Sequence, residues 1–327
     1  MTSTALPASG PEPPGPPDPA RAAPPGAPPG APPGTLRYDP ARGALYAVVA
    51  ELFFTSMAAS VKLASADLSN ETIVFFRNLF GLLFLLPWVL RPGMPGLATR
   101  HLRWHVVRAL AGLGSMYCFF YALAHVPMAE AVLMKLTAPL FIPLVAFLWL
   151  GERIPRQVGL AVLIGFAGVA FILRPGFGEL SPVLLVALGA GALAAAGKTG
   201  VRQLTRTEPI TRVVFYFALV STLVSALPLA WGWTAPGPQG WALLVLLGLL
   251  ATFGQTFMTA AYGLAPAAQI GPFTYSSVLF ASAYGWLLWG NTPTLVSGIG
   301  AVLVFAAGVA ATRARSREPA EPLSGTP

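Results

Sequence analysis

Six ionisable side chains lie inside long apolar stretches of this sequence: Glu51, Lys62, Arg77, Arg108, Lys135 and Lys198. A charge in the hydrocarbon of a bilayer costs about 2.5–3.5 kcal/mol on insertion scales, so each of these groups needs a partner or a wet cavity if the stretches cross a membrane. Glu51 could act as a protonatable coupling group or as a substrate contact. It could equally be the structural partner of Lys135, Lys198 or Arg108, and the sequence leaves both interpretations open.

The polar residues near Glu51 share one side of a predicted helix. Glu51, Thr55 and Lys62 fall on one stripe at helical spacing, which we expect to face the protein interior. Arg77 follows in the next stretch, and its planar guanidinium suits an anion or carboxylate clamp or a fixed structural pair. For Lys62 we favour snorkelling of the ammonium group to the headgroups.

Two predicted helices contain a proline at corresponding places. Lys135 is followed by Thr137 and Pro139, and a proline interrupts the hydrogen-bond ladder and exposes carbonyl groups that can line a cavity. The stretch 269–289 contains Pro272. Paired interruptions of this kind indicate a binding site near the middle of the membrane. Further polar candidates for that site are Gln255, Thr259, Gln269, Tyr275, Ser276 and Ser277.

The composition is that of an integral membrane protein. Of the 327 residues, 55% are apolar and 10% are charged, against about 25% charged in ordinary soluble domains. A helix of roughly 20 apolar residues can cross the hydrocarbon core. We therefore predict an all-α fold with ten transmembrane helices, at 43–64, 71–90, 105–124, 128–150, 156–174, 182–203, 211–231, 241–262, 269–289 and 294–312.

The motifs of enzymes and nucleotide-driven pumps are absent from the sequence. It contains no HExxH, GxSxG, Walker A or GxGxxG motif, and a single cysteine, Cys118. His101 and His105 lie in an arginine-rich stretch and are predicted to be surface residues. We expect no enzyme activity, no cofactor and no metal site, with a proton gradient or downhill exchange as the source of energy.

The arginines predict the orientation in the membrane. With the N-terminus in the cytoplasm, 14 arginines fall in cytoplasmic segments, and Arg174 alone falls in an outer loop. Cytoplasmic loops carry the excess of Lys and Arg in membrane proteins. This bias also explains the net charge of +8 without a nucleic-acid partner. We predict a multi-pass protein of the cell membrane with both termini in the cytoplasm.

The two ends of the chain differ from the apolar body. Residues 1–42 are rich in proline and repeat Ala-Pro-Pro-Gly three times, which predicts an extended, disordered cytoplasmic tail. Residues 313–327 are predicted to form a short cytoplasmic tail. The sequence leaves a homodimer open.

The apolar body repeats itself at an offset of 139 residues. Phe141 corresponds to Phe280 and Gly159 to Gly298 at that offset. The repeat covers five predicted spans twice, at 43–174 and 182–312. Because five is odd, the second copy must be inverted relative to the first. Inverted five-span repeats are typical of transporters whose substrate path lies between the two halves.

The sequence resembles the EamA domain of the drug/metabolite transporter superfamily. The resemblance covers 43–312 and is strongest at Phe75-Phe76-Arg77, at Tyr121-Ala-Leu-Ala, and from Ala138-Pro139 through Gly151-Glu152-Arg153. The second copy departs from the family pattern at Asn291 and Val278. The resemblance implies transport of small metabolites or drugs without specifying which.

Three functions remain in view from the sequence. We expect a secondary transporter that moves small metabolites, such as amino acids or related amphipathic compounds, by alternating access, and export is favoured. The first alternative is a facilitative importer or antiporter of an anionic metabolite, because the ionisable residues inside the spans are mostly positive. The second is a membrane scaffold without catalytic activity that uses the proline-rich tail as its binding segment.

Overall fold

The computed structural model describes residues 39–91, 96–150, 156–173, 181–204, 207–264 and 270–291, and ten residues between 295 and 310. Both predicted tails lie outside the described residues, apart from 39–42. So do Gln269 and nine of the 19 residues of the expected tenth span.

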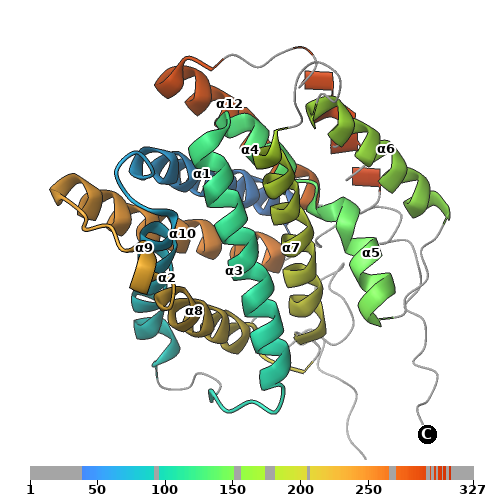
Figure 1. Cartoon of the computed structure of the whole chain (residues 1–327). Coiled ribbons are helices and arrows are strands. Elements are labelled where there is room, and N and C mark those ends of the chain that lie inside the picture. The colour runs from blue at the N-terminus through green and yellow to red at the C-terminus, as the bar shows by residue number, and fades with distance from the viewer. Residues whose placement is uncertain are drawn as a thin grey trace, which may run out of the picture.

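Within the described residues the secondary structure is helical, with no strand (Figure 1). The helices are α1 (Pro40–Ala64), α2 (Asn70–Val89), α3 (Leu102–His125), α4 (Met128–Lys135), α5 (Ala138–Leu150), α6 (Arg156–Leu173), α7 (Pro182–Leu204), α8 (Ile210–Ala226), α9 (Leu229–Gly232), α10 (Pro238–Leu264), the 3₁₀ helix η2 (Gly271–Tyr275) and α12 (Ser276–Trp289).

Local sequence signals fix several helix ends. The Asp39 carboxylate accepts a hydrogen bond of 3.0 Å from the backbone N–H of Arg42, and Pro40 occupies the first turn, so α1 begins three residues before the predicted start. At the other end of the chain, Gly290 adopts a left-handed φ of 67° and terminates α12.

Three predicted spans are interrupted in the structure. The span predicted at 128–150 consists of α4 and α5, separated by Leu136 and Thr137, which confirms the predicted break beside Lys135. The span predicted at 211–231 is divided into α8 and α9, because Pro228 lacks the backbone donor that would continue the hydrogen-bond ladder. The span predicted at 269–289 begins as η2 before it becomes α12.

The helices pack in two long pairs, α1 against α10 and α3 against α7, with α2 between α8 and α10. Glycines allow the close α3–α7 contact. A Cβ at Gly197 would lie 3.6 Å from the backbone nitrogen of Gly112, and one at Gly200 would lie 3.1 Å from the Cβ of Arg108. In the α1–α10 pair, Phe53 stacks on Phe253 with ring centroids 5.5 Å apart. These glycines of α3 and α7 therefore serve close helix packing.

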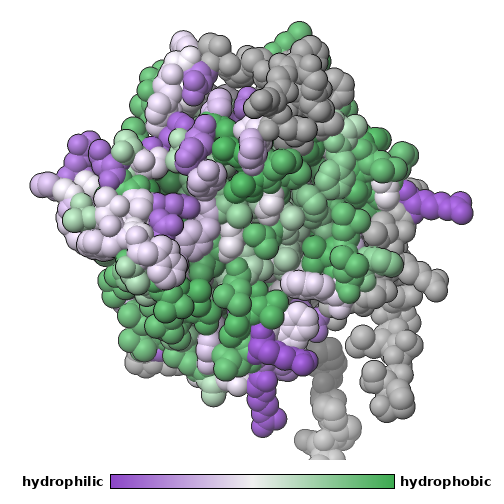
Figure 2. Space-filling model, in the orientation of Figure 1, coloured by the Kyte–Doolittle hydropathy of each residue, from purple (hydrophilic) through white to green (hydrophobic). Residues whose placement is uncertain are grey.

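Much of the outer surface is apolar. Leu148 is 75% exposed and Leu163 is 70% exposed. Hydrophobic side chains cover most of the face seen in Figure 2, and hydrophilic ones gather at its upper left and lower edge. Within the described part of the chain, five helices are long and apolar enough to cross a membrane: α1, α3, the α4–α5 pair, α7 and α10. An apolar exterior on such helices is the surface that lipid requires.

Candidate functional site

Several of the charges inside the apolar stretches form one network. Glu51 of α1 interacts electrostatically with Lys135 of α4 and Lys198 of α7. Lys135 in turn interacts with Arg77 of α2, and Arg77 with Arg108 of α3. Among the described residues, neither lysine forms a direct ion pair with Glu51. We call these five residues the interior charge network.

Most of the network is partly enclosed by the helices. The side chains of Glu51, Arg77, Arg108 and Lys135 are half-buried, and that of Lys198 is exposed. Burial removes water from these charges, which is costly unless a partner of opposite charge replaces it. The network is therefore a candidate site for a charged ligand.

Lys135 lies where the helix is interrupted. It is the last residue of α4, and its ammonium group lies 4.1 Å from the ring centre of Phe119, a cation–π contact. Thr137, in the break, is fully buried, and its hydroxyl donates to the Met134 carbonyl at 2.5 Å. Pro139 is half-buried in the first turn of α5. The break thus begins directly after a cation that contacts an aromatic ring.

Arg77 and Arg108 lack a carboxylate partner among the described residues. Arg77 donates from Nη1 to the side-chain oxygen of Asn78 at 3.1 Å. The guanidinium of Arg108 lies 3.8 Å from the ring centre of Phe217. The Nε atom of each arginine is buried without a hydrogen-bond partner. A buried polar atom without a partner is costly, so each arginine retains a donor for a ligand.

The remaining predicted site residues do not all join this network. Thr55, on the stripe of Glu51, is buried with its hydroxyl unpaired, and the Tyr275 hydroxyl is also buried and unpaired. Ser276, the first residue of α12, donates to the Phe273 carbonyl of the adjoining η2 at 2.7 Å. Thr259 donates to the carbonyl of Gln255, whose side chain is exposed.

Two sequence predictions are corrected by the structure. The ammonium group of Lys62 donates to the carbonyl oxygens of Leu123 and Val126, at 2.7 and 2.9 Å. It therefore caps the end of α3 rather than extending to the headgroups. His105 is fully buried instead of lying on the surface, and its ring lies 4.6 Å from that of Tyr216.

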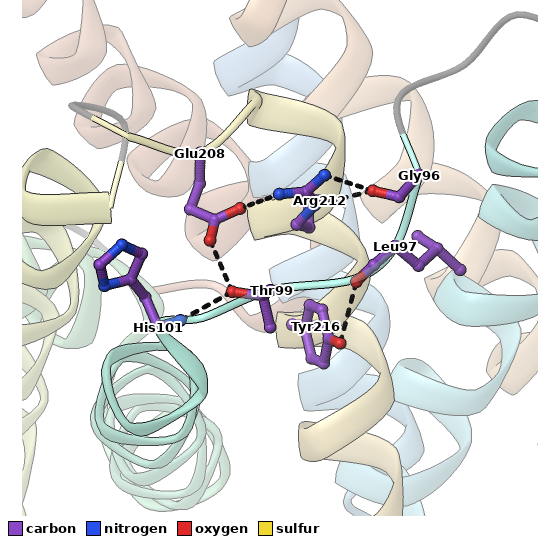
Figure 3. Close-up of polar contacts among 7 residues, drawn as sticks. All are labelled: Gly96, Leu97, Thr99, His101, Glu208, Arg212 and Tyr216. Atoms are coloured by element: carbon purple, nitrogen blue, oxygen red, sulfur yellow. Dashed lines mark hydrogen bonds and ion pairs between the residues drawn. The ribbon is translucent and has the colours of Figure 1, made fainter.

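A polar cluster joins the segment before α3 to the start of α8 (Figure 3). Thr99 donates to the Glu208 carboxylate at 2.5 Å, and Arg212 forms an ion pair with the same carboxylate and donates to the Gly96 carbonyl. Burial alone would raise the pKa of Glu208, but the hydrogen bonds from Thr99 and Arg212 outweigh it and hold that pKa below its usual range. We call it the Glu208 cluster: Gly96, Leu97, Thr99, His101, Glu208, Arg212 and Tyr216.

A second cluster joins the α1–α2 turn to the segment after α9. Ser69 donates to the Gly232 carbonyl, and the Thr234 backbone donates to the Thr72 hydroxyl at 3.1 Å. The sequence interpretation missed both clusters, because their partners are more than 100 residues apart along the chain. The spacing of Glu208 and Arg212, four residues apart on a helical segment, was the only local signal.

Comparison with known proteins identifies the family. The sequence model of the EamA-like transporter family matches the chain twice, over residues 41–174 and 181–312. The chain belongs to this family. Its EamA domain is present twice, as the sequence resemblance suggested.

Curated relatives of this EamA protein are transporters. The pseudopaline exporter CntI of Pseudomonas aeruginosa is 35% identical over 84% of this chain and 96% of its own length. The riboflavin transporter of Rhizobium johnstonii is 31% identical over 88% of this chain and 97% of its own. The S-adenosylmethionine uptake transporter of Rickettsia prowazekii is 27% identical over 75% and 84%. The EamA protein is thus a small-molecule transporter in a membrane and not an enzyme.

A solved structure supports the fold. It is titled "Crystal structure of protein", and it matches this EamA chain with a TM-score of 0.58 and 20% identity. The match covers 86% of this chain and all of the other. At this identity the likeness concerns the fold alone.

Proposed function

We propose that this EamA protein is a secondary transporter that moves small amphipathic metabolites out of the cell by alternating access. The observation that carries the proposal is the interior charge network, because it joins α1 and α4 of the first EamA domain to α7 of the second. A ligand held there would contact both halves. Rocking of the halves about such a site is how inverted-repeat transporters expose it to each side in turn.

The helix bounds support ten spans in two inverted repeats. Shifted by 139 residues, α5 falls on 277–289, where α12 covers 276–289, and α2 falls on 209–228, where α8 covers 210–226. The packing follows the same relation, since α1 against α10 corresponds to α7 against α3. The interruption between α4 and α5 corresponds to the change from η2 to α12. We place the two five-span units at 43–174 and 182–312.

The orientation rests on charge. The arginine bias supports both termini in the cytoplasm of a multi-pass protein in the cell membrane. Under this topology residues 1–42 and 313–327 are cytoplasmic tails, and the Glu208 cluster lies on the cytoplasmic side.

We propose Glu51 as the proton-coupling group. Lys135 and Lys198 face it from α4 and α7, so loss of its charge would unbalance two cations on separate halves of the protein. Protonation of one carboxylate would therefore alter the attraction between the halves. Export is the direction named for the more similar of the two relatives whose names give one, the exporter at 35% identity against the uptake transporter at 27%.

The test is a flux assay in proteoliposomes with a panel of amino acids and related amphipathic compounds. We expect at least one compound to move, an imposed pH gradient to accelerate it, and Glu51→Gln to remove only the acceleration. Asp67→Asn is the matched control, since Asp67 is an exposed acid in the α1–α2 turn. Acceleration that persists in Glu51→Gln would reject Glu51 as the coupling group.

Facilitated import or exchange of an anionic metabolite is the second candidate, because cations outnumber carboxylates in the network. Flux that is unchanged by the pH gradient in both the wild type and Glu51→Gln, and that anions inhibit by competition, would favour it.

A scaffold function for the proline-rich tail predicts that deletion of residues 1–42 abolishes function, whereas a transporter should keep its flux after the deletion. A homodimer would appear as a doubled mass in detergent.

A further inference from the structure

The interior charge network is strongly positive. It contains four cations and one carboxylate, Glu51, and so carries a net charge of +3. The other acidic residues that the structure describes lie in turns or near helix ends: Asp39, Asp67, Glu71, Glu130 and Glu208. Asp39, Asp67, Glu71 and Glu208 do not appear among the electrostatic partners of the four cations.

Part of the excess positive charge is concentrated at the two arginines of the network. Arg77 and Arg108 repel one another, and each has a buried Nε atom without a partner. The face of the Arg108 guanidinium is covered by Phe217, which leaves its edge for hydrogen bonding. An anion between the two guanidinium groups would relieve the repulsion and satisfy both orphaned donors.

We propose that Arg77, Arg108 and Lys135 bind an acidic group of the transported metabolite, which is a net anion with at least one carboxylate. The inference rests on the transport function proposed above and adds the charge of its substrate. Arginine edges match the two oxygens of a carboxylate. Glu51 offsets one positive charge, shared between Lys135 and Lys198, so the four cations keep an excess of three positive charges for the ligand.

A lipid phosphate would offer the same chemistry as a free metabolite. The location of the subsite favours the metabolite. Asn78, beside Arg77, is 1% exposed, and Phe119, beneath Lys135, is 3% exposed. These neighbours belong to the packed interior of the bundle and not to its lipid-facing surface, so a headgroup would have to enter between the helices.

The test measures binding to the full-length protein in nanodiscs of phosphatidylcholine. Thermal unfolding is followed with succinate, glutamate and citrate, each beside its amide. We expect at least one acid to raise the melting temperature and its amide to leave it unchanged. Arg77→Gln and Arg108→Gln should weaken the apparent affinity at least about tenfold, since a hydrogen bond to a charged group contributes about 1.5–3 kcal/mol.

Further variants separate binding from folding. Arg77→Lys keeps the charge without the planar edge and should bind with intermediate affinity. Lys62→Gln removes a cation outside the network and should bind as the wild type does. Circular dichroism checks that each variant is folded.

Three results would overturn the subsite. The first is that no acid raises the melting temperature more than its amide does. The second is that the arginine variants bind the acid as tightly as the wild type does, and the third is that phosphatidylglycerol in the nanodisc displaces the acid. If neutral or cationic compounds alone are transported in the flux assay, the subsite is wrong and the transport function stands. If an acid binds but no compound moves in the flux assay, the proposed secondary export is wrong and the anion subsite stands.

Discussion

Alanine at Gly191 should destabilise this EamA protein, whereas alanine at Gly197 on the same helix should not. Gly191 of α7 lies against the interruption between α4 and α5. A Cβ there would overlap the side chain of Thr137 and lie 2.8 Å from the carbonyl oxygen of Met134, which is backbone and cannot rotate away. At Gly197 the nearest atoms belong to Gly112, at 3.6 and 3.8 Å, which is ordinary contact.

The magnitude follows from the difference between the two variants. Each replaces a helical glycine, so the gain in helix propensity of about 0.8–1.0 kcal/mol is common to both. Overpacking costs about 1–3 kcal/mol and applies only at Gly191. We therefore expect Gly191→Ala to have a free energy of unfolding about 1–3 kcal/mol lower than that of Gly197→Ala.

The assay is reversible unfolding of both variants and the wild type in mixed detergent micelles, followed by tryptophan fluorescence. Gly197→Ala should unfold at the same denaturant fraction as the wild type or later, and Gly191→Ala earlier. Equal stability of the two variants would refute the close approach of α7 to the interruption.

Two further perturbations address contacts outside the charge network. Glu208→Gln should lower the free energy of unfolding by about 1–3 kcal/mol at pH 7. Because the pKa of Glu208 is held below its usual range, this difference from the wild type should shrink as the pH falls below about 4. A difference in stability that does not change with pH would contradict the ion pair. Lys62→Met should destabilise by a similar amount through loss of two hydrogen bonds to α3 and leave substrate affinity unchanged, as measured by unfolding and by flux.

Hydropathy predicted most of the described helices because lipid imposes a minimum length of apolar sequence on each span. The interruption beside Lys135 was also predictable, since Pro139 cannot donate a backbone hydrogen bond. Pro228 carries the same signal, but its span was predicted as continuous because its apolar composition does not change there. The start of α1 was missed although Asp39 and Pro40 form a recognisable N-terminal cap.

The candidate site was predictable as a set of residues but not as an arrangement. A charge inside an apolar stretch is costly wherever it lies, so Glu51 and Lys135 could be selected from the sequence alone. Which charges meet depends on how the helices pack, and spacing along one helix says nothing about that. Lys62 lies on the same stripe of α1 as Glu51, but it belongs to the last turn of the helix. There its ammonium group donates to carbonyl oxygens at the end of α3 and not to the charges near Glu51.

The two EamA domains have matching helices and different charges. At the 139-residue offset Arg77 corresponds to Tyr216, and Lys135 to Thr274. Tyr216 donates to the Leu97 carbonyl in the Glu208 cluster, so the position that contributes a cation to the interior charge network in the first domain anchors a loop in the second. A second set of cations would add repulsion that a single small anion could not neutralise. The interior charge network is accordingly asymmetric, with three cations from the first EamA domain and Lys198 from the second.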